Sequence, residues 1–145
     1  MSAIKYCELC DGNNGDVVFT GQHWRVLLVD DANYPGFCRV VWHAHVKEMT
    51  DLSKTERDDF MDTVWKVEQV IRDIMQPDKI NLASFGNMVP HLHWHIIPRY
   101  IDDAHFPNPV WAAAKTDLPD VGARKALLPE LRAALLKRLQ SDSLI

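Results

Sequence analysis

The sequence lacks two features that mark large classes of protein, an excess of basic residues and a long apolar run. Its 145 residues hold 16 Lys and Arg against 20 Asp and Glu, so a general nucleic-acid binder is not expected. No apolar stretch approaches the roughly 20 residues that cross a bilayer, so we expect no membrane partner. The first residues lack a basic segment followed by an apolar one, which indicates a cytoplasmic protein without a signal peptide.

Cysteine is scarce too, and neither repeats nor a linker interrupt the chain. An odd count of three cysteines does not suit a disulfide framework. Cys7 and Cys10 are spaced as C-x-x-C, which in a cytoplasmic protein indicates metal or redox chemistry, whereas Cys38 is interpreted as a small core residue. With 47% hydrophobic residues, the chain is predicted to form a single domain over residues 1–145.

The pattern of residues predicts strands and two helices. The stretch SKTE at 53–56 has the form of a capping box, and apolar residues then recur every three or four positions until Pro77. This stripe consists of Phe60, Val64, Val67, Ile71 and Ile74. A second helix is predicted over 127–140, and strands are predicted over 16–20, 23–30, 37–45, 79–86 and 92–99, the last two as a hairpin. We therefore expect an α+β fold with a mainly antiparallel sheet of about five strands, one long packed helix and a C-terminal helix.

Three histidines alternate in the segment VPHLHWHIIPRY at 89–100. On a strand His91, His93 and His95 would share one face, and the apolar residues between them would pack on the long helix. The outer two would lie about 13 Å apart, so three such imidazoles cannot readily bind one ion. A lone strand histidine is usually a packing residue, but three on one face are polar groups that need partners, which favours a functional role.

A metal site could be assembled from distant segments. Cys7 and Cys10 could supply half of a tetrahedral zinc site, although two free cysteines are an equally good interpretation of C-x-x-C alone. The other half would have to come from histidines. The stretch WHAH offers His43 and His45, which we expect on one strand face.

The stretch HLHWHII resembles the His-x-His-x-His-x-x motif of the histidine-triad (HIT) family of nucleotide hydrolases and transferases. The similarity extends to CELC, the Pro35-Gly36 turn, VVWHAHVKEMTDLS and IIPRY, and covers residues 7 to about 101, leaving 102–145 as an extension. The bacterial branch similar to diadenosine tetraphosphate hydrolases matches best. The resemblance implies a cytoplasmic homodimer that cleaves nucleoside polyphosphates or phosphoramidates at the α-phosphate and uses no organic cofactor.

The resemblance also implies a role for each catalytic histidine. His93 would be the nucleophile and form a covalent nucleotidyl-histidine intermediate, and His95 would hydrogen-bond the phosphate oxygens. His91, the first of the three, would bind a structural zinc ion together with Cys7, Cys10 and His45.

Further positions are matched to substrate contacts. The resemblance implies that Asp30 binds the ribose hydroxyls and that Asn81 and Asn87 contact the phosphates, while Met88 stands where many relatives have Ser or Thr next to the leaving group. From their positions, His43 could face the pocket, Arg99 could attract a polyphosphate or be a solvated charge, and Trp111 could lie near a base. The sequence gives none of these three a firm assignment.

Two other functions fit the same residues. A metal-dependent hydrolase could use His43-x-His45 and His91-x-His93 around a catalytic ion, although such sites usually include carboxylates. A nucleotide-binding or interaction module with little turnover is the second.

Overall fold

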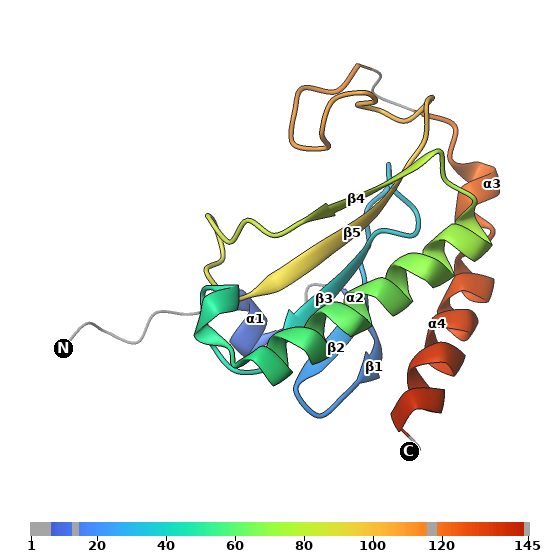
Figure 1. Ribbon diagram of the computed structural model, residues 1–145. Coiled ribbons are helices and arrows are strands. Elements are labelled where there is room, and N and C mark those ends of the chain that lie inside the picture. The colour runs from blue at the N-terminus through green and yellow to red at the C-terminus, as the bar shows by residue number, and fades with distance from the viewer. Residues whose placement is uncertain (1–6, 13–14, 116–118, 144–145) are drawn as a thin grey trace.

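The computed structural model describes residues 7–12, 15–115 and 119–143. Within them the chain forms a five-stranded antiparallel sheet in the order β1-β2-β3-β5-β4, with the two long helices on one face (Figure 1). The strands are β1 Asp16–Thr20, β2 Trp24–Leu28, β3 Cys38–Trp42, β4 Lys79–Ala83 and β5 His93–Arg99. The predicted α+β fold with a five-stranded antiparallel sheet is therefore confirmed.

Five helical segments accompany the sheet in the described residues. They are α1 Glu8–Asp11, the 3-10 turn η1 Met49–Asp51, α2 Lys54–Met75, α3 Gly122–Lys125 and α4 Leu128–Ser143. Only α2 and α4 were predicted. None of these helices combines the length and the apolar character that crossing a membrane requires.

Helix α2 begins and ends where local sequence signals place it. The Ser53 hydroxyl accepts from the Glu56 amide at 3.2 Å, and the Glu56 carboxylate accepts from the Ser53 amide at 2.7 Å. Each side chain thus satisfies a backbone N–H that the first turn leaves without a helical partner. At the other end Gln76 adopts a left-handed conformation, φ 48°, just before Pro77.

The core lies between the sheet and its two long helices. The predicted stripe of α2 is buried except at Ile74, which is half-buried, and it packs against Val40 of β3 and Ile96 of β5. Helix α4 lies beside α2 and β1 and contributes Leu131, Leu135 and Leu139 to the same core. Both helices cover one face, so the opposite face of the sheet is left for other side chains.

Two predicted strands, 37–45 and 79–86, extend three residues beyond the C-terminal ends of the observed strands. The predicted third strand ends at Trp42, and His43 and His45 lie in the bend that follows, so they do not share a strand face. The His43 amide still donates to the His23 carbonyl at 2.8 Å, next to the last β2–β3 pair of Trp24 and Trp42. The predicted strand over 79–86 ends at Ala83, and β5 begins at His93, so a loop of residues 84–92 precedes the histidine strand.

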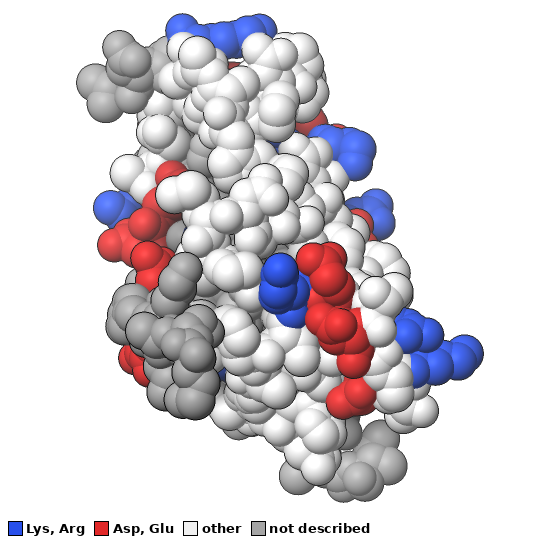
Figure 2. Space-filling model, turned by 90° about the vertical axis from the view of Figure 1, so that its left-hand side faces the viewer, with Lys and Arg blue, Asp and Glu red and all other residues white. Residues whose placement is uncertain are grey.

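Charged side chains of both signs are scattered over the face drawn in Figure 2, around a broad uncharged area.

The segment that follows β5 turns back over β4 and β5 before the chain reaches α3 (Figure 1). It reaches the face of the sheet away from α2 and α4, where Trp111 meets His95.

Candidate functional site

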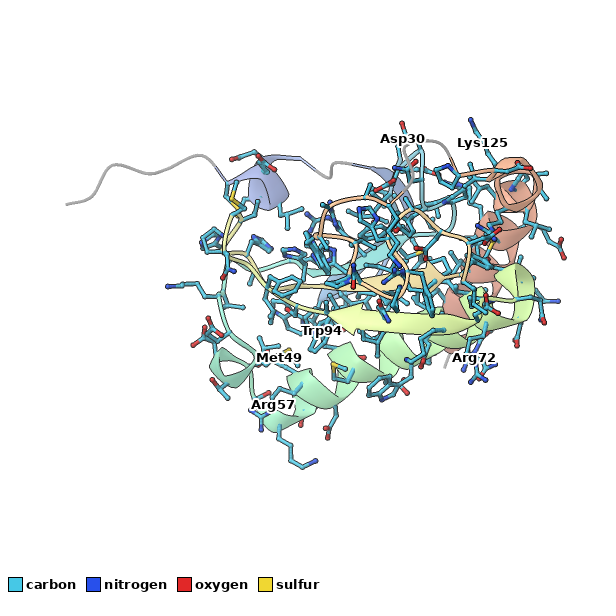
Figure 3. All side chains as sticks on the ribbon, turned by 90° about the horizontal axis from the view of Figure 1, so that it is seen from above. Asp30, Met49, Arg57, Arg72, Trp94 and Lys125 are labelled. Atoms are coloured by element: carbon cyan, nitrogen blue, oxygen red, sulfur yellow. The ribbon has the colours of Figure 1, made fainter. Side chains whose placement is uncertain are left out.

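Strand β5 divides its side chains between the two faces of the sheet. Leu92, Trp94 and Ile96 pack with the α2 core, as predicted. Figure 3 shows Trp94 on the side of α2 and Asp30 on the opposite side. His93 and His95 lie on the face away from α2 and are each only 7% exposed. Burial on that face requires a partner for each ring nitrogen that carries a proton.

The backbone fixes the proton of His93. Its Nδ1 lies 2.5 Å from the His91 carbonyl oxygen, which can only accept, so Nδ1 carries the hydrogen. The other nitrogen, Nε2, therefore keeps its lone pair. Burial lowers the pKa of His93 and the nearby Arg39 charge lowers it further, against the opposing effect of the His91 carbonyl. An uncharged ring with a free Nε2 is the form that can act as a nucleophile or base.

His95 has the opposite arrangement of protons. The Arg39 Nε–H donates to His95 Nδ1 at 3.4 Å, so in the neutral ring Nε2 carries the hydrogen. Burial, followed by the charges of His93 and Arg39, lowers the pKa of His95 to about 3. The His93 and His95 rings meet edge to face with centroids 4.8 Å apart. One ring thus presents a lone pair and its neighbour a hydrogen.

Arg39 is a site residue that the sequence interpretation missed. It lies on β3 directly opposite His95 of β5, and its guanidinium stands 5.7 Å from the centroid of the Phe37 ring. Burial lowers the pKa of Arg39, although a guanidinium stays charged at neutral pH. The available signal was a charged residue within the otherwise apolar strand 38–42, because a central strand rarely buries a charge without a reason.

Two cavities meet at these residues. The smaller, of about 240 Å³, is lined by Glu8, Leu9, Val29, Arg39, Val89 and His93. The larger, of about 400 Å³, is lined by Arg39, Phe85, Gly86, Asn87, Met88, Val89, His93, His95 and Trp111. Both contain His93 and Arg39, so the reactive nitrogen and the positive charge lie where the two cavities adjoin.

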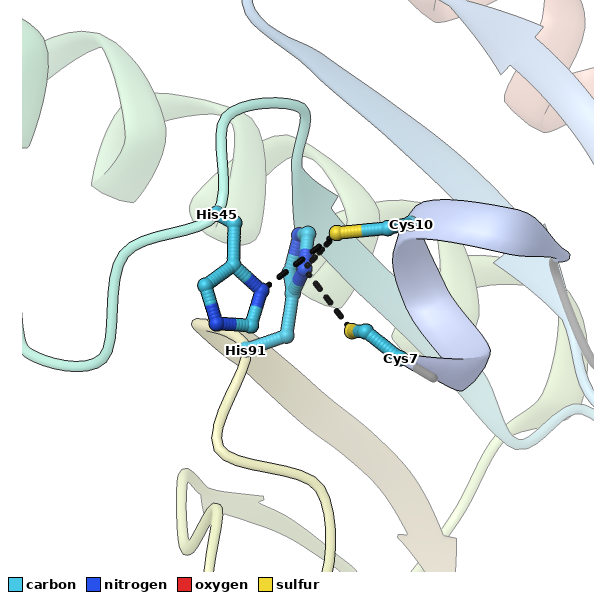
Figure 4. A group of neighbouring side chains, drawn as sticks. All are labelled: Cys7, Cys10, His45 and His91. Carbon is cyan, nitrogen blue, oxygen red and sulfur yellow. Dashed lines mark hydrogen bonds between the residues drawn. The ribbon is translucent and has the colours of Figure 1, made fainter. Parts of the chain in front are cut away.

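A second cluster lies at the N-terminal end of β5 (Figure 4). The ligand atoms of Cys7, Cys10, His45 and His91 all lie within 4.8 Å of one another and form a potential metal site among the described residues. They come from α1 and the residue before it, from the bend after β3 and from the residues just before β5. Segments far apart in the chain thus place two sulfurs and two imidazoles around one point.

The geometry of this cluster fits a tetrahedral ion. The Nδ1 of His91 lies 3.5 Å from Cys7 Sγ and 3.4 Å from Cys10 Sγ, and Cys10 Sγ lies 3.3 Å from His45 Nδ1. Zinc bonded to sulfur and nitrogen at its usual distances places those two atoms about 3.5 Å apart. His91 Nε2 donates to the Trp42 carbonyl at 2.6 Å, so its Nδ1 lone pair is turned toward the sulfurs.

The four predicted metal ligands therefore converge, but the histidine pairs of a metal-dependent hydrolase do not. His43 Nε2 donates to the Gly21 carbonyl at 2.9 Å, and its Nδ1 lies 3.4 Å from Arg25. Arg25 also donates to the Leu9 carbonyl, so His43 belongs to the support of α1 rather than to either cavity. The expectation that His43 faces the pocket is wrong.

The predicted substrate residues are dispersed. Asn87 lines the larger cavity, whereas Asp30 is exposed and Asn81 is half-buried, and neither lines either of the two cavities. The Oδ1 of Asn81 instead accepts from Arg99 at 2.7 Å. Arg99 is only 2% exposed and pairs with Asp103 at 2.8 Å, so it is neither a solvated charge nor a ligand for a polyphosphate.

Asp103 is the centre of a buried polar network beyond β5. Its carboxylate accepts from Arg99, from the Tyr34 hydroxyl at 3.2 Å and from the amides of Tyr100, His105 and Phe106. Tyr34 also contacts His105 Nδ1 at 2.6 Å. The sequence interpretation assigned His105 no role. This network secures the start of the segment that carries Trp111 across the site.

Comparison with known proteins shows the family to which this chain belongs. A model described as the HIT domain matches residues 12–102. The chain is similar to an AP-4-A phosphorylase of Mycobacterium tuberculosis, 32% identical over 78 residues, and to an asymmetrical bis(5'-nucleosyl)-tetraphosphatase of Schizosaccharomyces pombe, 36% identical over 70 residues. These matches cover 50% and 45% of this chain but only 40% and 38% of the relatives, so the chain matches about two fifths of their length.

Solved structures match over more of the chain. A histidine triad protein from Bradyrhizobium japonicum has a TM-score of 0.72 and 29% identity, covering 86% of this chain and 90% of its own. A histidine triad protein from Marinobacter aquaeolei has a TM-score of 0.70 and 26% identity, covering 88% and 90%. In both, the matched region extends beyond the part that the family model covers.

Proposed function

Because this chain belongs to the HIT domain family, we propose that it cleaves nucleoside polyphosphates or phosphoramidates at the α-phosphorus, with His93 as the nucleophile. The observation that carries the proposal is the hydrogen bond from His93 Nδ1 to the His91 carbonyl. This bond leaves Nε2 with its lone pair at the wall that the two cavities share. The names of the relatives support diadenosine polyphosphates as the substrate class.

In the first step His93 Nε2 attacks the α-phosphorus. An N–P bond forms as the bond from phosphorus to the leaving group breaks, which gives a nucleotidyl-histidine and a free leaving group. His95 donates its Nε2 hydrogen to a phosphoryl oxygen, and the Arg39 charge offsets the negative charge of the phosphate chain. Both groups are held in place before substrate arrives, since Arg39 and His95 hydrogen-bond each other.

In the second step water attacks the same phosphorus and the N–P bond breaks. The products are the nucleoside monophosphate and His93 with its original proton arrangement, while the proton from water passes to solvent. A polyphosphate leaves as a stable anion, whereas an amine must be protonated to leave. Met88 lines the larger cavity at the position where many relatives have Ser or Thr next to the leaving group, and it has no proton to donate, which favours anhydride over phosphoramidate substrates.

We also propose that Cys7, Cys10, His45 and His91 hold a zinc ion. Burial, followed by the proximity of Cys7, raises the pKa of the Cys10 thiol, so two thiolates this close call for a cation. Four protein ligands leave no position for water, so the ion would supply structure rather than chemistry. It would tie α1 to the residue whose carbonyl holds the His93 proton.

The remaining expectations belong to the same proposal. Asp30, Asn81 and Asn87 stay candidates for ribose and phosphate contacts, with Asn87 the best supported because it lines the larger cavity. A cytoplasmic location suits free thiols in a metal site. A homodimer is proposed from the family alone, and sedimentation of the purified protein at micromolar concentration would test it.

The test measures turnover of diadenosine tetraphosphate and of an adenosine phosphoramidate by the wild-type protein and by the His93→Ala variant. The wild-type protein is expected to release AMP, and His93→Ala to lose on the order of a thousandfold or more of that activity while still binding AMP. His23→Ala, which changes an exposed histidine on the way into β2, is the matched control and should keep full activity. Acid quenching followed by mass spectrometry should find an adenylyl group on His93.

Other outcomes identify the competing functions. Full activity in His93→Ala would sink the covalent mechanism. Binding of AMP without release of AMP from either substrate would point to a binding module. Immediate inactivation by a chelator, reversed by added metal, would point to a catalytic ion in place of a structural one.

A further inference from the structure

Two exposed aromatic rings stand next to the catalytic pair. Phe85 lies in the loop after β4 and Trp111 in the segment after β5, and their ring centroids are 4.5 Å apart with planes at 81°. They are 56% and 51% exposed, and Trp111 also meets His95 edge to face at 5.5 Å. Large aromatic surfaces left open to water beside a reactive site indicate a ligand surface, because burying them within the protein would have been favourable.

Trp111 is held in this position by its neighbours in sequence. Val110 packs on the cluster of Tyr34, Phe37 and Ile97, and the Asn108 carbonyl accepts from Arg99 at 2.7 Å. The loop is closed at its base by the Lys115 amide, which donates to the Ala104 carbonyl at 2.6 Å. The exposure of Trp111 is therefore a property of an anchored loop and does not reflect a loose one.

The larger cavity is divided into a charged end and an aromatic end. Arg39, His93 and His95 supply the positive charge and the ring nitrogens, whereas Phe85, Met88 and Trp111 supply apolar surface. Asn87 is the one amide side chain in the lining. A ligand that fits both ends has an anionic part followed by a flat aromatic part, and stacking rather than hydrogen bonding would hold the flat part.

We propose that the aromatic end of the larger cavity binds the second nucleobase of a dinucleoside polyphosphate, the half that departs when His93 attacks. This inference rests on the proposed function. The smaller cavity shares His93 and Arg39 with the larger one, so a substrate spanning both lays its phosphate chain across the nucleophile and the guanidinium. Because aromatic faces stack on any base, the subsite prefers a nucleobase to none but tolerates a change of base.

The experiment compares two substrates with the same reacting phosphorus. Diadenosine tetraphosphate carries a second nucleoside and adenosine tetraphosphate does not. The wild-type protein is expected to favour the former in kcat/KM by about tenfold, the usual size of one base stacking contact. Trp111→Ala should remove most of that preference by lowering kcat/KM far more for diadenosine tetraphosphate than for adenosine tetraphosphate, and Trp111→Phe should retain most of it because stacking survives.

Trp65→Ala is the matched control, because Trp65 is an equally exposed tryptophan (48%) on α2, away from both cavities. It should leave the preference unchanged. An equal loss for both substrates in Trp111→Ala would show that Trp111 only positions His95, and no loss would show that it contacts neither substrate. Either result overturns the subsite. Replacing the distal adenine by guanine or cytosine should change kcat/KM by less than about fivefold if stacking alone holds it.

A binding measurement separates failure of this inference from failure of the proposed function. Calorimetry with His93→Ala should show tighter binding of diadenosine tetraphosphate than of adenosine tetraphosphate, and the double variant with Trp111→Ala should bind both equally. If the wild-type protein turns over neither substrate, the mechanism fails while this preference still supports the subsite. If turnover depends on His93 and no preference exists, the subsite alone fails.

Discussion

The two ends of β5 both carry polar clusters, but the first is partly exposed whereas Arg99 and Asp103 of the second are buried. At the beginning of the strand, four potential ligand atoms from Cys7, Cys10, His45 and His91 converge. At its end, Arg99 donates to Asp103 and Asn81, and Asp103 accepts from side chains and amides. The second cluster joins a charged pair to its own hydrogen-bond partners, whereas the first brings together atoms that a metal ion can bind.

This difference separates a ligand site from a structural network. Two sulfurs and two ring nitrogens within 4.8 Å of one another form a ligand set that suits a cation, so the first cluster could bind one. A network that matches its own donors and acceptors needs nothing further, and it stabilises the loop that carries Trp111. His93 and His95 lie between the two clusters. The first cluster contains His91, whose carbonyl accepts from His93, and the second secures the loop whose Trp111 meets His95.

The largest loss of stability is expected when a residue of the first cluster is replaced. Cys10→Ser should reduce bound zinc from one per chain to a small fraction and lower the free energy of unfolding by about 4 kcal/mol when free zinc exceeds its Kd a thousandfold. Metal analysis and urea unfolding would measure both. Cys38→Ala alters the third cysteine, outside the cluster, and should keep its zinc. One zinc per chain in Cys10→Ser would contradict the ligand assignment.

The second cluster should respond differently. Asp103→Asn leaves the Arg99 charge buried without its partner and should cost about 3 kcal/mol of unfolding free energy while the zinc content stays unchanged. Asp102→Asn is the control, because Asp102 is exposed and its pair with Arg124 is at the surface. Similar unfolding midpoints for the two variants would show that the network contributes little.

The same pair predicts a dependence on pH. Burial raises the pKa of Asp103, but Arg99 and three backbone amides together hold it well below its usual value. A carboxyl whose pKa is lower in the folded protein adds stability above its unfolded pKa of about 3.9 and loses it in more acidic solution. The difference in stability between wild type and Asp103→Asn should therefore shrink below about pH 4, which urea unfolding at several pH values would measure. A constant difference would contradict the ionised pair.

A smaller change tests the edge of the network. Tyr34→Phe removes a hydroxyl that contacts both Asp103 and His105, and should cost about 1 kcal/mol of unfolding free energy. Kinetics of the variant should be close to wild type if the network acts only on stability. A loss of the preference for dinucleotide substrates would show that it also positions Trp111.

The smallest of these effects is a change in the pKa of His95, which lies between the two ends of β5. Arg39→Gln removes a charge next to His95 and should raise the pKa of that ring, which nevertheless stays below its ordinary value because burial is the larger cause. NMR titration of the ring carbons, with free imidazole as reference, would measure it. The wild-type His95 signal should not titrate between pH 5 and 8, since its pKa is about 3.

Local patterns predicted those parts of the molecule that local interactions build. The capping box at Ser53 and the apolar stripe are contained within one helix, so α2 was found with its bounds close to those observed. The alternation along β5 likewise placed His93 and His95 opposite the core, whereas His91, also predicted on this strand face, lies in the loop before β5. The metal ligands came from family resemblance, since Cys7 and His91 are 84 residues apart and no spacing rule joins them.

What the sequence determined by itself is therefore the set of elements and the chemical nature of the triad, because these depend on neighbours along the chain. Tertiary structure alone decided which atoms meet. It paired Arg39 with His95 across two strands, buried Arg99 against Asp103 and carried Trp111 back over the site. It also separated His43 from His45, because a bend after β3 turned one toward Gly21 and the other toward the cysteines. Such contacts join segments distant in sequence, and their geometry exists only once the strands have paired into the sheet.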